Sequence, residues 1–238
     1  MPSTRNRVIW NLLRLAMSGV IVAAVAAQFA SSVDVAAAYD RDAATTVGNF
    51  FSFFTILSNL AAAAVLMWSS LWWFSRGRRT GPPEPRGLAI AVACVTSYMI
   101  VTGVVYNALL RGIELPQGSV AIPWSNEVLH LIGPAFLLLD LVIGPVGRRL
   151  GWRTVPVVLI FPIVWVAYTL VRGPATTNPA TGDPWWYPYP FLDPNGPGGA
   201  ASVAWYILAI ALVIALVATG VVWVDRRRSA QNRAPRVA

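Results

Sequence analysis

Residues 123–146 read PWSNEVLHLIGPAFLLLDLVIGPV, a polar start followed by an apolar run. The run is long enough to cross a membrane as a helix, which takes ~20 residues for a hydrocarbon core of ~30 Å. It contains His130, the single histidine of the chain. A histidine inside a membrane span is costly to desolvate, so it usually faces the protein interior or a water pocket. The segment predicts a membrane helix and leaves open whether His130 is a catalytic base or a structural residue.

The whole chain has the composition of a membrane protein. Of its 238 residues, 56% are hydrophobic and only 12% are charged, whereas soluble domains carry roughly 25% charged residues. The net charge of +8 would suggest a nucleic-acid partner in a soluble protein. In a membrane protein the distribution of charge matters more than its sum, so no nucleic-acid partner is expected. One histidine and one cysteine do not supply the usual ligand set of a metal, so neither a metal nor a cofactor is predicted.

Six apolar stretches are long enough to span a bilayer as helices. The predicted fold class is an all-α, polytopic membrane protein whose short connections favour a compact bundle of six antiparallel transmembrane helices. The bundle forms one domain over residues 1–225, followed by a basic tail over residues 226–238. The first stretch could also be read as a signal peptide, although its apolar part exceeds the usual ~7–15 residues. The predicted spans are 8–30, 50–74, 88–110, 124–146, 155–171 and 200–224.

Arginines gather in alternate connections between the predicted spans. The amino end, the second-to-third and fourth-to-fifth connections and the tail hold most of them, whereas the other connections hold three arginines among several acidic residues. The bias of basic residues toward the cytoplasm therefore predicts an integral membrane protein with both termini in the cytoplasm. The arginines on the predicted inner side are Arg5, Arg7, Arg76, Arg78, Arg79, Arg86, Arg148, Arg149, Arg153, Arg226, Arg227, Arg228, Arg233 and Arg236.

The last predicted outer connection, residues 173–199, is long and rich in proline and glycine. It contains WWYPYPFL at 185–192. Its aromatic rings could form a belt at the level of the lipid headgroups. Alternatively, the proline-stiffened segment folds as a lid over the outer mouth of the bundle. The sequence leaves both interpretations open.

Polar side chains of several spans fall in the outer half of the predicted bundle. If the second span enters the membrane at Phe50, Thr55 lies ~8 Å below that boundary. If the fourth span enters at Trp124, His130 lies ~9 Å below it, at a matching depth. Tyr106 lies near the outer end of the third span. The sequence therefore predicts a polar site in the outer half of the membrane.

Local spacing indicates which side chains share a helical face. Ser52, Thr55 and Asn59 follow an i, i+3, i+7 pattern, so they are expected on one face of the second span. Asn126 is four residues before His130 and Glu127 is three residues before it. Either neighbour could therefore orient the imidazole, and such a bond decides which ring nitrogen is basic.

Thr55 and His130 are the residue types that covalent acyl transfer requires, a nucleophile and a base. A threonine hydroxyl is a poor nucleophile until a base takes its proton, and histidine is the usual base. A donor such as Asn59, Tyr106 or Asn126 could hold the oxyanion. The alternative is structural, because most threonines in membrane helices bond to their own backbone or to a neighbouring helix.

Two charged residues lie in the inner half of the predicted bundle, Arg14 in the first span and Asp140 in the fourth. Pairing with each other would reduce the cost of burying both charges. We therefore expect a structural ion pair. The alternative is a step in a proton path, which would favour a transporter.

Three short motifs resemble a known family. The segment Trp124-x-Asn126-x-x-x-His130, followed by Asp140, resembles the androgen-induced-gene family of six-span membrane proteins, which includes the androgen-dependent regulator of tissue factor pathway inhibitor. The sequence YPFLD at 189–193, with GPG at 196–198 before the last span, looks like a loop of that family in the same order. The run NFFSFFTILSN at 49–59 is similar to that of bacterial six-span relatives. The likeness covers spans two to six.

The resemblance implies an intramembrane threonine hydrolase that cleaves fatty acid esters of hydroxy fatty acids. The family's nucleophile is a threonine early in the second span, and its base is the histidine of the Trp-x-Asn-x-x-x-His segment. The matching positions are Thr55 and His130. Glu127 and the longer Pro/Gly-rich loop before Tyr189 depart from the animal members, and these differences bear on the substrate rather than on the chemistry.

The predicted function is therefore hydrolysis of a membrane lipid ester, with Thr55 as nucleophile and His130 as base. A small-molecule or proton-coupled transporter and a non-catalytic membrane scaffold are the two alternatives. The transporter requires a cavity reaching both membrane faces, and the scaffold requires only bonds between helices. Candidate residues of the substrate pocket are Ser52, Asn107, Tyr168, Tyr189 and Phe191.

Overall fold

The computed structural model describes residues 3–80, 84–113, 121–145 and 148–231, and these residues form an all-α bundle. Six helices are long and apolar enough to cross a membrane, which confirms the predicted polytopic fold class. Because lipid offers no hydrogen-bond partners, apolar stretches of this length satisfy their backbone as helices. The six spans are Thr4–Ala38, Phe54–Gly77, Arg86–Leu110, Pro123–Ile143, Thr154–Ala175 and Gly199–Gln231.

Several spans are built from more than one helical segment. The helices are α1 (Thr4–Ala38), α2 (Ala43–Phe50), α3 (Phe54–Trp72) with η1 (Trp73–Gly77), α4 (Arg78–Thr80), α5 (Arg86–Val105) with η2 (Tyr106–Leu110), α6 (Pro123–Glu127) with η3 (Val128–Ile132) and α7 (Gly133–Ile143), α8 (Thr154–Arg172) with η4 (Gly173–Ala175), η5 (Pro190–Leu192) and α9 (Gly199–Gln231).

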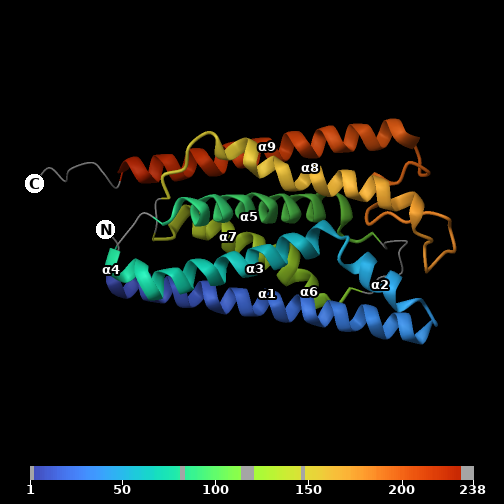
Figure 1. Ribbon diagram of the computed structural model, residues 1–238, viewed down its shortest axis with the longest axis horizontal. Helices are drawn as coiled ribbons and strands as arrows, with labels where there is room; N and C mark the ends of the chain where they lie inside the picture. Colours follow the sequence, from blue (N-terminus) through green and yellow to red (C-terminus); the bar gives the residue numbers. More distant parts are fainter. Residues whose placement is uncertain (1–2, 81–83, 114–120, 146–147, 232–238) are drawn as a thin grey trace, which may run out of the picture.

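The spans run alternately up and down. Helix α1 packs along α3, α3 along α5, and α5 contacts α7 and α9, with α8 packed on α9 (Figure 1). The start of α1 and the end of α9 lie at one end of the bundle, called the terminus end below (Figure 1). Helix α2 and the connection between α8 and α9 lie at the opposite end, called the loop end (Figure 1).

The second span begins at Phe54, so the expected start at Phe50 is wrong. Helix α2 ends at Phe50 and a turn at residues 51–52 precedes α3. The indole N–H of Trp165 holds this turn by donating to the carbonyl of Ser52 at 2.9 Å. Ser52 is therefore not on the helix that carries Thr55 and Asn59, and the predicted three-residue face is reduced to two residues.

The first and last spans are longer than their apolar runs. Helix α1 has 35 residues, which corresponds to roughly 52 Å at 1.5 Å per residue, more than a bilayer core requires. Helix α9 continues into the predicted tail as far as Gln231. Its last turns are fixed by tertiary contacts, since Asp225 accepts hydrogen bonds from the backbone N–H groups of Arg148 and Leu150 at 2.7 Å and 2.9 Å.

Small residues allow the third and fourth spans to approach each other closely. A Cβ atom added to Gly103 would lie 3.0 Å from the Cβ of Pro134 and 3.2 Å from the carbonyl oxygen of His130. A Cβ atom on Gly133 would lie 3.0 Å from Met99. Such small residues are typical of helix contacts in membranes. They bring η3, which carries His130, against α5.

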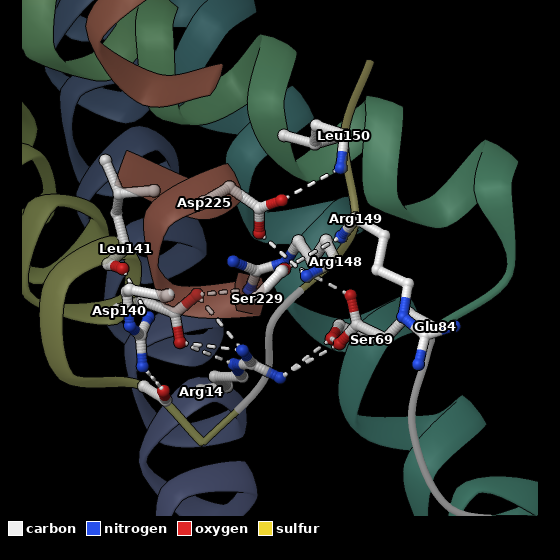
Figure 2. A network of polar contacts seen from close by, with 12 residues as sticks. Arg14, Ser69, Glu84, Asp140, Leu141, Arg148, Arg149, Leu150, Asp225 and Ser229 are labelled. Atoms are coloured by element: carbon white, nitrogen blue, oxygen red, sulfur yellow. Dashed lines mark hydrogen bonds and ion pairs between the residues drawn. The ribbon is translucent and has the colours of Figure 1, made fainter. Parts of the chain in front are cut away.

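A buried ionic network closes the terminus end (Figure 2). Arg14 donates from Nε to Asp140 at 2.8 Å, as the expected ion pair requires. Arg148 binds Asp140 at 2.7 Å and Glu84 at 3.1 Å, and Arg14 also donates to Ser69 at 2.9 Å. Burial alone lowers the pKa of Arg148, but the Glu84 and Asp140 carboxylates outweigh it, so its pKa is raised and it stays charged.

Candidate active site

The structure brings Thr55 and His130 into contact. Thr55 is the second residue of α3, and His130 lies in the π-helical segment η3. Their Oγ1 and Nε2 atoms are 3.4 Å apart. This is at the long end of the range for a hydrogen bond, and catalytic hydrogen bonds often shorten only when substrate binds. Single-turn π segments occur frequently at functional sites.

The hydrogen bonds of His130 fix which nitrogen is basic. Its Nδ1 lies 3.0 Å from the backbone carbonyl oxygen of Asn126. Because a carbonyl can only accept, Nδ1 carries the proton and the lone pair of Nε2 faces Thr55. Tyr106 stacks on the imidazole with ring centroids 3.7 Å apart and planes at 21°. The ring is thus held in position for proton transfer from the threonine hydroxyl.

Of the two residues proposed to orient the imidazole, Asn126 does so through its backbone rather than its side chain. The Asn126 Nδ2 donates instead to the Tyr106 hydroxyl at 2.5 Å and so holds the ring that covers His130. The Glu127 carboxylate instead pairs with Arg111, whose Nη1 lies 2.9 Å from it. Both partners of that pair are exposed, so Glu127 belongs to the surface.

Tyr189 is the third side chain at Thr55. Its hydroxyl oxygen lies 3.2 Å from the backbone N of Thr55 and 3.2 Å from Oγ1. The Tyr189 ring packs edge-on against Phe53 and stacks on Phe191 at 5.1 Å. Burial raises the pKa of Tyr189, more than its bonds to Thr55 and Phe54 lower it. The phenol is therefore a protonated donor at neutral pH.

Tyr189 reaches Thr55 because the 173–199 segment folds inward as a lid. Trp186, Tyr187, Tyr189 and Leu192 in this segment are each less than 10% exposed. Tyr187, Tyr189 and Leu192 pack in one cluster with Leu110 of η2 and Val203 of α9. The backbone N–H of Trp186 donates to the carbonyl of Gly173 at 3.0 Å. These rings face the protein interior, so the lid interpretation describes them and the belt interpretation does not.

A cavity of about 180 Å³ lies beside Thr55. Its walls come from α3, η2 with the end of α5, the lid, α8 and α9. Polar groups at the surface of the cavity are few and are supplied by Thr55, Thr102, Tyr106 and Tyr189, with the indole of Trp165. Helices α8 and α9 contribute apolar stripes spaced i, i+3, i+4, i+7, namely Leu159, Pro162, Ile163, Val166 and Ile207, Ile210, Ala211, Ile214.

Asn59 and Asn107 hold the backbone of the site instead of facing the cavity. The Asn59 Nδ2 donates to the carbonyls of Thr55 at 2.9 Å and Leu129 at 3.2 Å, and so ties α3 to η3. The Asn107 Nδ2 donates to the carbonyls of Gly103 at 2.7 Å and His130 at 3.2 Å. Asn59 therefore does not fill the oxyanion role suggested for it, since its donor is already used.

The predicted pocket residues divide into two groups. Tyr189 and Phe191 line the cavity, whereas Ser52, Asn107 and Tyr168 do not. Ser52 and Tyr168 form a separate pair with their hydroxyl oxygens 2.9 Å apart. The stripes of α8 and α9 were not predicted, because apolar residues in a membrane helix look the same whether they face lipid, core or cavity.

The site combines groups that acyl transfer uses: a hydroxyl as nucleophile, a neutral imidazole as base and a phenol as hydrogen-bond donor, beside an apolar cavity. Among the described residues, no group of three or more His, Cys, Asp or Glu side chains is placed to hold a metal ion. No family model, curated protein or solved structure matches the chain.

Proposed function

We propose that this protein is a membrane-embedded ester hydrolase in which Thr55 is the nucleophile and His130 the base. One observation carries the proposal: Tyr189, Thr55, His130 and the carbonyl of Asn126 form a single chain of hydrogen-bonding contacts beside an apolar cavity. With Nδ1 protonated, all hydrogen bonds in this series can donate in the same direction. Tyr189 O–H donates to Thr55 Oγ1, Thr55 O–H to His130 Nε2, and Nδ1–H to Asn126.

The reaction follows from this direction. Thr55 Oγ1 attacks the ester carbonyl carbon while its proton passes to Nε2 of His130. The tetrahedral intermediate collapses by breaking the bond between the carbonyl carbon and the alcohol oxygen, and His130 returns the proton to that oxygen. Water then attacks the acyl-threonine, with His130 again taking and returning a proton, and the acid and free Thr55 are released.

Tyr189 supplies the oxyanion donor in this scheme. Its hydroxyl is 3.2 Å from Oγ1, so the carbonyl oxygen of an ester under attack at Oγ1 comes within its reach. When Thr55 loses its proton and bonds to carbon, the phenol proton turns from Oγ1 to the developing oxyanion. The Tyr106 hydroxyl, which accepts from Asn126 and lines the cavity, keeps its own proton to donate.

The substrate we propose is a lipid ester, since the cavity is lined almost entirely by apolar side chains. This agrees with the fatty acid esters implied by the family resemblance. We also propose that the terminus end is cytoplasmic, because the arginine-rich connections gather there. The lid and the site then belong to the outer half of a bacterial plasma membrane.

The geometry supports a hydrolase over the scaffold alternative. A scaffold needs only helix-to-helix bonds, whereas here the Thr55–His130 contact has a neutral base, a third donor and an adjacent cavity. The Arg14–Asp140 pair, which the transporter alternative would use, is held by a further ion pair between Asp140 and Arg148 (Figure 2). No observation favours transport specifically.

The test is covalent labelling and turnover in detergent. The purified protein is treated with a fluorophosphonate probe, and hydrolysis of p-nitrophenyl octanoate is followed in parallel. We expect labelling and turnover in the wild type, their loss in Thr55→Ala and His130→Gln, and partial turnover in Thr55→Ser. Thr219→Ala is the matched control, because Thr219 is exposed and bonds only to the carbonyl of Ala215. Labelling and turnover that persist in both Thr55→Ala and His130→Gln would falsify the proposal.

A further inference from the structure

Thr55 meets both the cavity and the base. It lines the cavity and contacts His130, whereas His130 does not line the cavity. Tyr106, which lines the cavity, stacks on the imidazole. A general acid must reach the oxygen of the leaving alcohol. The alcohol part of the ester must therefore point toward His130, and the acyl chain must extend in the other direction.

We propose, on the basis of the hydrolase function, that the Thr55 cavity is the binding site for the acyl chain of the ester. The alcohol part lies outside it, on the His130 side. The α8 and α9 stripes, spaced so that each presents one continuous face, form the wall along which the chain lies. Selectivity for the acid half of the substrate thus resides in α8 and α9, away from the reacting groups.

Beside Pro162, a hydrogen bond between α5 and α8 holds the wall of this cavity. Pro162 has no N–H, so the carbonyl of Val158 one turn earlier loses its helical partner. The Tyr98 hydroxyl donates to that carbonyl at 2.9 Å. Tyr98 and Val158 pack with Ile214 in one buried cluster, and Ile214 also lines the cavity. The acyl chain of the substrate therefore meets packed side chains where the cavity adjoins Ile214.

Ile163 of α8 lines the cavity and is also 58% exposed at the surface of the bundle. In this proposal the acyl chain enters beside Ile163, directly from the bilayer. A cavity of about 150 Å³ holds one benzene molecule, so the volume of about 180 Å³ beside Thr55 corresponds to roughly seven carbons by the same scale. The cavity fits the acyl carbons next to the carbonyl, and longer chains continue past Ile163 into lipid.

Two isomeric esters separate the acyl side from the alcohol side. Ethyl octanoate places its eight-carbon chain on the acyl side, and octyl acetate places an eight-carbon chain on the alcohol side. Ala211→Phe fills the cavity from α9. Because the phenyl ring occupies the space that the acyl chain needs, we expect it to lower kcat/KM for ethyl octanoate about tenfold or more. Octyl acetate should be hydrolysed at nearly the wild-type rate.

Leu212→Phe is the matched control, because Leu212 is the next residue on α9 and is 61% exposed on the lipid-facing surface. It should leave both esters unchanged. An equal loss of activity toward both esters in Ala211→Phe, or a loss confined to octyl acetate, would overturn the acyl-chain assignment while the hydrolase function stands.

If the wild type hydrolyses neither these two esters nor p-nitrophenyl octanoate, the proposed function fails and a binding readout tests the cavity alone. The probe is octanoic acid with a diazirine at the chain end, cross-linked to the Thr55→Ala protein and mapped by residue. We expect labelling on the α8 and α9 stripes that excess octanoate suppresses and that Ala211→Phe, but not Leu212→Phe, removes. Labelling that is neither suppressed by octanoate nor changed by Ala211→Phe would overturn the binding site itself.

Discussion

At the scale of single residues, the catalytic character of Thr55 depends on what surrounds it. The nearby Tyr189 hydroxyl contacts both its backbone N and its Oγ1, and His130 presents the unprotonated nitrogen. A buried phenol keeps its proton because its pKa is raised by burial. A donor and an acceptor therefore face the same hydroxyl from two sides, which polarises it in one direction.

Replacing Tyr189 by Phe removes the proposed oxyanion donor and leaves the ring contacts in place. Removing one such donor typically lowers kcat by about 10²–10³, so we expect a loss in that range with little change in KM. Steady-state hydrolysis of p-nitrophenyl octanoate measures both constants. Tyr206→Phe is the control, since Tyr206 packs on Phe191 at 5.5 Å without touching Thr55. An unchanged kcat in Tyr189→Phe excludes the phenol from the mechanism.

Asn59 is a positioning residue for the same pair. Its Nδ2 joins the carbonyls of Thr55 and Leu129, and leaving buried groups unpaired costs about 1–3 kcal/mol. We expect Asn59→Ala to lower the midpoint of unfolding and to lower kcat, because α3 and η3 lose their link. Asn59→Asp keeps the shape but loses the donor, so it should behave like the alanine variant. Full activity in both variants contradicts the positioning role.

At the scale of elements, irregular segments place the site. The π-helical segments η1, η2 and η3, the turn before α3 and Pro162 interrupt ideal helix geometry, and η2 and η3 carry Tyr106 and His130. In a membrane such interruptions are tolerated only where other groups satisfy the freed backbone. Tyr98 does this for Val158, and Asn59 supplies a donor to Leu129 in η3.

A double-mutant cycle tests the role of Tyr98 at Pro162. Tyr98→Phe alone leaves the Val158 carbonyl unpaired and should lower the free energy of unfolding. In Pro162→Ala the restored backbone N–H can serve that carbonyl, so removing the Tyr98 hydroxyl should cost less. Because hydrogen bonds between membrane helices average about 0.6 kcal/mol, the coupling should be of that order. Unfolding in mixed detergent micelles measures it, and strictly additive effects would show that the two residues act independently.

The lid depends on the absence of a side chain at Gly173. A Cβ atom there would overlap the ring of Tyr187. Gly173→Ala should therefore displace the lid, increase proteolysis within residues 173–199 and lower turnover by moving Tyr189. Gly220→Ala is the control, because a Cβ atom at Gly220 meets nothing within 4 Å. Unaltered proteolysis and turnover in Gly173→Ala would mean that the lid adapts without moving Tyr189.

At the scale of the whole molecule, the two ends of the bundle have different chemistry. The terminus end is closed by paired ionised groups, Arg14 and Arg148 with Glu84 and Asp140 (Figure 2). The loop end holds neutral polar and aromatic groups around Thr55. We interpret the ionic end as a structural closure that joins α1, α7 and the connections beside them.

Asp140→Asn tests this division of roles. Breaking a buried ionic pair by neutralising one partner costs about 3–5 kcal/mol, so the variant should unfold at a lower denaturant concentration. At low temperature, kcat per folded molecule should stay close to wild type because Thr55 lies at the other end. Asp34→Asn, an exposed residue of α1, serves as control. A folded Asp140→Asn protein with no activity would contradict this division of roles, because turnover would then depend on the ionic end.

The sequence by itself determined the six apolar helices and the pairing of Arg14 with Asp140. The pair of Thr55 and His130 was also expected, but from depths that assumed a helix starting at Phe50, which the turn before α3 interrupts. Apolar runs of this length form helices because lipid leaves the backbone no other partners. The ion pair of Arg14 and Asp140 followed from the cost of burying single charges. These are local or one-dimensional properties, so they can be read along the chain.

Only the tertiary structure decided how the site is completed. The turn that starts α3 at Phe54 depends on Trp165, 113 positions away from Ser52, and no local pattern contains that contact. The inward fold of the lid, the choice of the Asn126 backbone to orient His130, and the α8 and α9 stripes around the cavity also arise between distant segments. A membrane helix is apolar on every face, so its sequence does not mark the face that packs against a cavity, and packing alone selects it.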